Sequence, residues 1–298
     1  MRPPARPGGL PHDDVKRAVL YMAYAMALIP LLNASAKYLS RDYAIPEIVW
    51  ARYAGHFFYM LIAFAPRRGV RLLITARPVM QLLRSTLLFA STALYFTAIS
   101  YVPLPTAAAI SFTGPFIVTL LAPAVLGEAV GLRRRASVGL GFTGALVIVR
   151  PGLDANHWAA FLVFGSATTS ALYQLFTRKL AAHDAAETSI TYIALAGFVL
   201  ASAILPFYWR MPASLLDALL FIGLGVFGGF GHYFIVRAYE LAPAPVVTPF
   251  NYGQLLGAAL LSYTVFGEFP DLWTWLGAAI IVASGIYMIY GEKRRGRP

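Results

Sequence analysis

The sequence predicts an all-α membrane protein in which ten transmembrane helices form two inverted-topology five-helix repeats. Two features predict the helices: 59% of the 298 residues are hydrophobic and only 12% are charged, whereas a soluble protein carries about 25% charged residues. A third feature predicts the repeat. Shifted by 140 residues, Ala98–Glu128 lies over Ala238–Glu268 with eight identical positions, which include two prolines and a Gly-Glu pair.

Ten segments are long and apolar enough to cross a bilayer, which takes about 20 mostly apolar residues. In chain order they are Val15–Tyr38, Glu47–Ala65, Met80–Ser100, Pro105–Leu126, Leu132–Val149, Trp158–Phe176, Ile190–Phe207, Leu215–Val236, Val246–Phe266 and Trp273–Tyr290. Proline, glycine or charged residues separate them. The first segment loosely imitates a signal peptide with Ala34-Ser35-Ala36 as its cleavage site. A retained helix fits better, because the segment has a counterpart in the second half.

The distribution of lysine and arginine predicts the orientation. With the N-terminus in the cytoplasm, 17 of these residues fall in cytoplasmic segments and four in external loops, and positive charge favours the cytoplasmic side. Both termini are therefore expected in the cytoplasm. Because each repeat (residues 1–152 and 153–298) holds an odd number of helices, the second enters the membrane from the opposite side. Many secondary transporters have this architecture, with the substrate near the midplane.

Composition and motifs exclude several classes of function. The chain has no cysteine, which excludes disulfides and thiolate metal sites. No H-E-x-x-H or G-x-S-x-G motif is present, so we expect no enzyme activity, no metal and no cofactor. The net charge of +11 resides in short clusters between apolar segments, a pattern that does not indicate nucleic-acid binding.

A family resemblance covers essentially the whole chain. Tyr95–Phe116 with Leu126-Gly127-Glu128, and the second copy that ends at Val265-Phe266-Gly267-Glu268, resemble the drug/metabolite transporter (DMT) superfamily, EamA type. Arg52 also sits where that family commonly has an arginine. Within the superfamily the chain looks most like YddG-type amino-acid exporters. The resemblance implies a multi-pass carrier in the bacterial inner membrane that exports aromatic and other neutral amino acids.

Polar and aromatic side chains within the predicted spans are the candidates for a substrate site, because polar groups in hydrocarbon usually face a bundle interior or a wet cavity. The side-chain amides of helix 9 fall where the second copy departs from the Pro115-Phe116 pattern of the first. The alternative is interhelical hydrogen bonding. The candidates are Asn251, Gln254, His232, Tyr95, Phe112, Ser111, Tyr173, Gln174, Asn33 and Tyr24.

A second group of residues is expected to serve structure or gating. It comprises Arg52, Glu128, Glu268, Pro115 and Gly229. Pairing with Glu47 is the structural interpretation of Arg52, and the alternative is that it holds a substrate carboxylate. The two glutamates at the ends of helices 4 and 9 lie beside the start of the next helix, where a carboxylate is stabilised.

The predicted function is alternating-access transport of a small molecule by a monomer in the lipid bilayer. No Asp or Glu lies near the middle of a predicted span, and proton relays commonly use such residues. We therefore expect passive uniport. Proton-coupled export of cationic drugs or other metabolites, and a channel, remain as alternatives.

Overall fold

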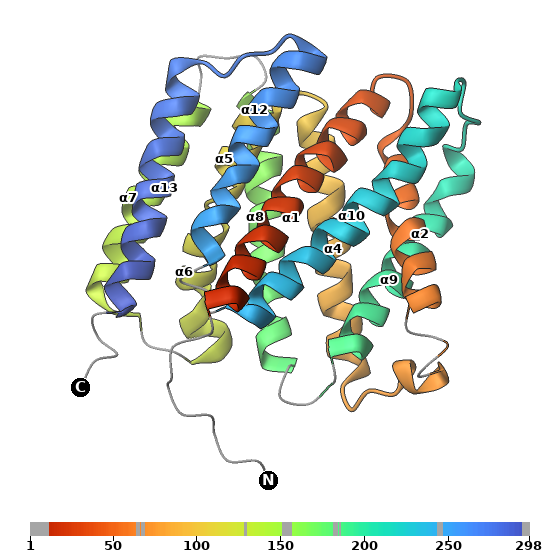
Figure 1. Ribbon diagram of the computed structural model, residues 1–298, viewed down its shortest axis with the longest axis horizontal. Coiled ribbons are helices and arrows are strands. Elements are labelled where there is room, and N and C mark those ends of the chain that lie inside the picture. Colours follow the sequence, from red (N-terminus) through yellow and green to blue (C-terminus); the bar gives the residue numbers. More distant parts are fainter. Residues whose placement is uncertain are drawn as a thin grey trace.

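The structure is a computed structural model that describes residues 12–63, 66, 69–127, 130–150, 157–180, 184, 186–242 and 247–293. Regular secondary structure in this part of the chain is entirely helical (Figure 1). The elements are α1 (His12–Leu39), α2 (Ile45–Ala63), η1 (Gly69–Leu73), α4 (Pro78–Ile99), α5 (Leu104–Ser111), α6 (Gly114–Leu126), α7 (Leu132–Val149), α8 (His157–Leu180), α9 (Ala186–Ile204), η2 (Leu205–Phe207), α10 (Leu215–Leu241), η3 (Thr248–Tyr252), α12 (Gly253–Phe266) and α13 (Leu272–Lys293), where η marks a 3₁₀ helix.

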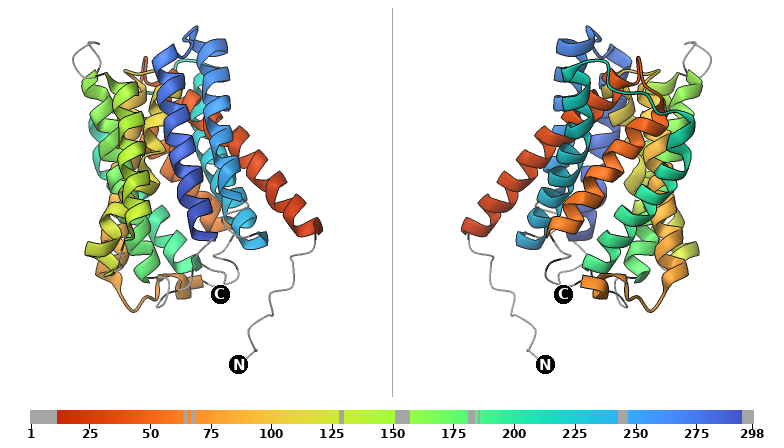
Figure 2. Two further views of the ribbon diagram at one scale, coloured as in Figure 1. Left: turned by 90° about the vertical axis from the view of Figure 1, so that its left-hand side faces the viewer. Right: turned by 90° about the vertical axis from the view of Figure 1, so that its right-hand side faces the viewer.

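The helices form one bundle in which successive long helices run in opposite directions. Helix α1 begins, and α13 ends, at the same end of the bundle (Figure 1). We call this end the inner end and the opposite one the outer end. Each predicted span corresponds to one helix or to two consecutive pieces, which are α5 with α6, α9 with η2, and η3 with α12. Helix α1 leans away from the bundle at its inner end (Figure 2).

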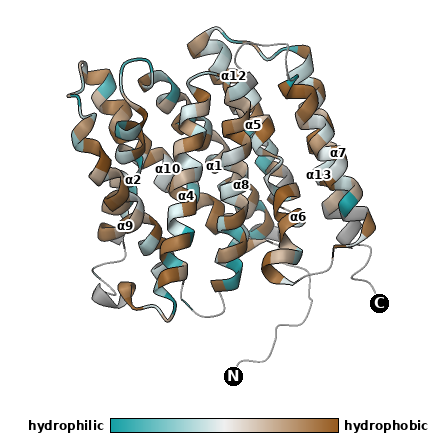
Figure 3. Ribbon diagram, turned by 180° about the vertical axis from the view of Figure 1, so that it is seen from behind, coloured by the Kyte–Doolittle hydropathy of each residue, from teal (hydrophilic) through white to brown (hydrophobic). Residues whose placement is uncertain are grey.

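Length and composition indicate a membrane environment. Six helical segments in the described part are long and apolar enough to cross a membrane, and Arg135–Val149 and Leu272–Met288 are apolar but shorter. Hydrophobic residues predominate along the helices (Figure 3), and many large ones are exposed. Leu219, Leu260 and Ile62 are 56%, 63% and 78% exposed. Apolar exposure spread over so much of the surface marks a membrane-facing molecule.

Two of the crossings are irregular inside the bundle. Between α5 and α6, the Thr113 N–H bonds the Ile110 carbonyl at 3.0 Å, an i→i−3 contact that tightens the chain into a 3₁₀ turn. Pro115, which has no N–H to donate, is the second residue of the new helix, which begins at Gly114. The second change falls between Tyr252 and Gly253, where the 3₁₀ helix η3 continues directly into α12. The hydropathy pattern predicted both crossings as continuous spans.

Backbone contacts between glycines fix two helix pairs. A Cβ on Gly55 of α2 would lie 2.3 Å from the Cα of Gly225 on α10, and a Cβ on Gly277 of α13 would lie 2.4 Å from the carbonyl oxygen of Gly144 on α7. Small residues allow this close approach of helices in membranes. Each pair joins a helix of the first half of the chain to one of the second half.

Candidate functional site

An arginine deep in the bundle is the centre of the most unusual polar cluster. Arg52 is the eighth residue of α2, which places it about 10 Å along the helix axis at 1.5 Å per residue. Its Nη1 donates to Thr92 Oγ1 of α4 at 2.7 Å, and its Nη2 lies 3.3 Å from His232 Nε2 of α10. The guanidinium also lies over the rings of Tyr53 and Phe96, 5.7 and 5.6 Å from their centroids. Helices from both halves of the chain therefore build this cluster.

The expected ion pair between Arg52 and Glu47 is wrong. The carboxylate of Glu47 accepts backbone N–H groups instead, from Arg210 at 2.5 Å and from Ala44 at 3.2 Å. It thereby closes the first turn of α2 and holds the segment before α10. The closeness of Glu47 and Arg52 in sequence suggested an ion pair. It could not show that two backbone N–H groups already donate to the Glu47 carboxylate.

The polar cluster is accessible. His232 is exposed and Arg52 is half-buried, although both belong to helices that cross the bundle. One turn beyond Thr92 on α4, the hydroxyl of Tyr95 is buried and has no hydrogen-bond partner among the described residues. An unpartnered buried hydroxyl is costly, so Tyr95 is a candidate for contact with a bound molecule.

The aromatic rings at the two irregular crossings meet. Phe112, at the end of α5, and Tyr252, at the end of η3, pack edge to face with centroids 4.9 Å apart. Ser111 bonds back to the carbonyl of Ala107 at 2.9 Å, so its hydroxyl is partly used within its own helix. The adjacent Pro115 is exposed. The contact between Phe112 and Tyr252 brings two candidate elements together, one from each half of the chain.

The two amides of helix 9 lie three residues apart where η3 meets α12. Asn251 belongs to η3 and Gln254 to the first turn of α12, and the backbone between them stays in the right-handed helical region. Asn251 Nδ2 donates to the hydroxyl of Tyr239 at 3.1 Å, which favours its structural interpretation. Gln254 is half-buried in the first turn of α12.

The candidates on α8 lie near a second intramembrane arginine. Tyr173 packs its ring 5.3 Å from the guanidinium carbon of Arg84, whose Nη2 donates to the carbonyl of Ser189 at 2.6 Å. Gln174 is exposed, and only a long contact of 3.5 Å joins it to Ser170. Tyr173 is thus engaged in packing, whereas Gln174 is available to a ligand.

Two candidates on α1 face different surroundings. Tyr24 is 48% exposed and contacts the ring of Phe234 at 5.5 Å. Asn33 is 7% exposed, and its helical spacing from Pro30 and Lys37 places it on the face that packs on α12. Asn33 therefore lies between α1 and α12, while Tyr24 lies near the middle of α1 and contacts α10.

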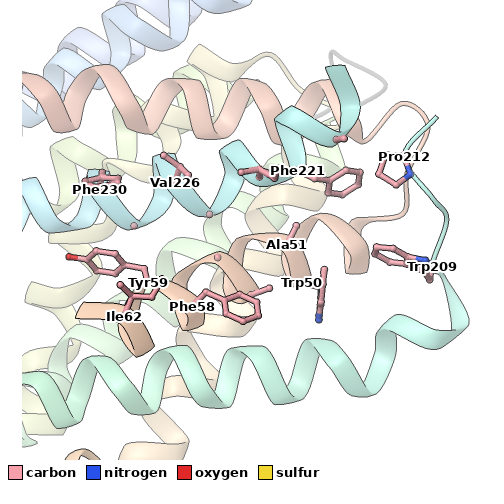
Figure 4. Close-up of a pocket in the computed structure, with 16 residues that line it drawn as sticks. Trp50, Ala51, Phe58, Tyr59, Ile62, Trp209, Pro212, Phe221, Val226 and Phe230 are labelled. Carbon is pink, nitrogen blue, oxygen red and sulfur yellow. The ribbon is translucent and has the colours of Figure 1, made fainter. Parts of the chain in front are cut away.

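Gly229 lines an apolar groove rather than the polar cluster. The groove has a volume of about 600 Å³ and lies between α2, α10 and the segment before α10 (Figure 4). Its walls include Trp50, Phe58, Phe221 and Phe230, and none of its lining residues is charged. The groove therefore has no charged side chain that could form an ion pair with a bound molecule.

An ion pair that the sequence did not reveal closes the outer end. Lys37 Nζ donates to Glu268 Oε2 at 2.6 Å and to the carbonyl of Val102 at 3.1 Å. Ser262 also donates to Glu268 at 3.3 Å. The contacts join α1, the α4–α5 connection and α12. Glu268 therefore joins α12 to α1 through Lys37, and Glu128, its counterpart in the first repeat, lies outside the described residues.

Metal chemistry has no support in the described part of the chain. There, no group of three His, Asp or Glu side chains is arranged to hold a metal ion. What the geometry offers is a fixed cation, neutral hydrogen-bonding groups and aromatic rings. A bundle of membrane-spanning helices with such a cluster inside it defines the class of the protein, a membrane transporter for small molecules.

The chain belongs to the EamA-like transporter family. The sequence model of this family matches it twice, over residues 16–150 and 157–291. The chain is 31% identical over 292 residues to the riboflavin transporter of Vibrio cholerae (94% of this chain, 95% of the relative). It is 29% identical to the S-adenosylmethionine uptake transporter of Rickettsia prowazekii (88% of each chain). It is 28% identical to the pseudopaline exporter of Pseudomonas aeruginosa (94% of this chain, 99% of the relative).

The fold has a counterpart among solved structures. A crystal structure with 18% sequence identity superposes with a TM-score of 0.64 over 95% of this chain and 99% of the other. At this identity the likeness supports the fold alone. Family and fold together establish a multi-pass membrane transporter of the DMT superfamily, with relatives in bacteria.

Proposed function

We propose that the protein is an alternating-access carrier that moves small polar metabolites across the bacterial inner membrane. The observation that carries this proposal is the accessible cluster of Arg52, His232 and Thr92, which helices of both halves build inside the bundle. A polar cluster at this depth is costly and is retained where a substrate passes.

The two halves act as inverted repeats in this proposal, with both chain ends in the cytoplasm. The double match to one family model supports the repeat. The helix packing supports it as well, because α1 packs on α10 as α4 packs on α8, the same pairing with the halves exchanged. The ion pair between Lys37 and Glu268 then closes the outer face in this conformation, and transport requires that it open.

The proposed substrates are aromatic and other neutral amino acids, moved outward. The accessible arginine and the aromatic side chains around it support this class, because such a molecule combines a carboxylate with a planar ring. The near-full-length relatives favour a second candidate, S-adenosylmethionine or riboflavin. S-adenosylmethionine and riboflavin also carry aromatic rings. A single transport assay with all of these compounds therefore tests both substrate classes.

The test is counterflow in proteoliposomes that contain the purified protein. Labelled L-phenylalanine, S-adenosylmethionine and riboflavin are offered outside vesicles loaded with the same unlabelled compound. We expect saturable, transient accumulation of at least one of them. Flux without saturation or counterflow would indicate a channel instead.

The same vesicles test the energy source. Passive uniport predicts that accumulation proceeds without an imposed proton gradient, since no Asp or Glu lies near the middle of the predicted spans. Stoichiometric alkalinisation of the lumen, or an absolute need for a pH gradient, would favour the proton-coupled alternative.

A further inference from the structure

Arg52 is a permanent cation without an acidic partner. The guanidinium stays protonated in proteins, and its described contacts are the hydroxyl of Thr92, the ring nitrogen of His232 and two aromatic faces. No carboxylate among the described residues pairs with it, since Glu47 is engaged elsewhere. An unpaired charge at this depth carries a large desolvation cost. A bound anion would offset that cost.

The guanidinium has hydrogen-bonding capacity to spare. An arginine has five N–H donors, and the contacts with Thr92 and His232 use two of them. To accept from Arg52, His232 Nε2 must lack a proton, so its ring is neutral and carries the proton on Nδ1. Thr92 and His232 thus hold the guanidinium plane in place without neutralising it.

Helix α10 packs beside the arginine at a glycine. A Cβ on Gly228 would lie in ordinary van der Waals contact, 3.8 Å from Arg52 Cγ and Nε and 3.7 Å from Leu32 Cδ2. The absence of a side chain at Gly228 therefore leaves the polar end of Arg52 uncrowded by α10. The exposed ring of His232 lies one turn further along α10.

We propose that Arg52 binds the carboxylate of the transported molecule, so that the substrates of this carrier are carboxylate-bearing metabolites. The inference rests on the proposed function and names the substrate class of its site. A carboxylate accepts two parallel N–H bonds from a guanidinium, and one fixed positive charge matches its single negative charge. A phosphate monoester carries close to two negative charges at pH 7 and would leave one unbalanced.

Matched ligands test the proposal on the detergent-purified protein. Benzoate and benzamide share a shape, but only benzoate carries the charge, and phenyl phosphate supplies the other anion. Benzoate is expected to raise the melting temperature in a saturable manner. Benzamide and phenyl phosphate are expected to act at least about tenfold more weakly. Equal effects of benzoate and benzamide, or tighter binding of phenyl phosphate, would overturn the proposal.

Variants of Arg52 locate the effect. Arg52→Gln is expected to raise the apparent Kd for benzoate at least roughly tenfold, the effect of losing hydrogen bonds to a charged group. Arg52→Lys keeps the charge but loses the planar fork. Its apparent Kd for benzoate is expected to lie between those of the unmodified protein and Arg52→Gln. Arg41→Gln is the control, because Arg41 is an exposed cation at the outer end, and it should bind benzoate like the unmodified protein. Full binding by either Arg52 variant would contradict the assignment, and the Lys variant serves if the Gln variant does not fold.

Counterflow separates this inference from the proposed function. Exchange of riboflavin, which has no carboxylate, combined with no binding of benzoate would leave a carrier but overturn the anion site. Arg52-dependent binding of benzoate without exchange of any labelled compound would keep the site but contradict the proposed carrier activity on those substrates.

Discussion

Lys37 illustrates how one side chain can join three parts of the chain. It is 7% exposed and bonds both Glu268 and the carbonyl of Val102. Removal of one partner from a buried pair leaves an uncompensated charge, which costs more than the pair contributes. The ion pair is therefore a point where a small change should loosen the outer end.

We predict that Glu268→Gln lowers the free energy of unfolding by about 1 kcal/mol, a value discounted because the Glu268 side chain is 37% exposed. The matched control is Glu240→Gln, which breaks the exposed pair between Arg237 and Glu240 and should cost less than about 0.5 kcal/mol. Thermal unfolding in one detergent measures both. Equal destabilisation by the two variants would contradict a special role for the outer ion pair.

The sequence predicted the polar residues of the site better than their partners. It placed Arg52 and His232 inside spans, because charge and imidazole stand out in apolar segments. It could not show that they meet, since 180 residues separate them and only the packing of α2 on α10 brings them together. Lys37 lies at the outer end of the predicted span Val15–Tyr38, where a lysine is expected to face water, and its partner Glu268 is 231 residues away.

At the scale of helices, hydropathy predicted where nearly every span lies but not where a span is broken. Helix α7 has the predicted bounds of Leu132–Val149, because charge and glycine limit it on both sides. The pieces α5 and α6 form one apolar stretch, so composition indicates a single helix. The interruption depends on local hydrogen bonds around Thr113 and Pro115, which hydropathy does not record.

The glycine contact between α2 and α10 gives a prediction for these elements. Gly55→Ala places a Cβ 2.3 Å from the backbone of Gly225, so the helices must separate, and we expect a clear drop in melting temperature. Gly139→Ala on α7 is the matched control, because its Cβ would meet nothing within 4 Å. There, the higher helix propensity of alanine should leave stability unchanged or raise it by up to about 1 kcal/mol. Similar melting temperatures for the two variants would contradict the close packing of α2 and α10.

For the whole molecule, the central claim is that two similar halves cross the bilayer in opposite senses around a shared site. The lysine and arginine distribution predicts the orientation, and the ends of α1 and α13 on one side of the bundle agree with an even number of crossings (Figure 1). The side of the bundle that faces the cytoplasm can be measured directly in cells.

Single-cysteine labelling in intact cells tests this claim most directly, because the chain has no cysteine of its own. Asp42 follows the first span of the first half and Lys179 ends the first span of the second half, and both are exposed. A membrane-impermeant maleimide is expected to label Asp42→Cys in intact cells but Lys179→Cys only after permeabilisation. Labelling of both residues from the same side would contradict the inverted arrangement of the halves, and with it the proposed transport mechanism.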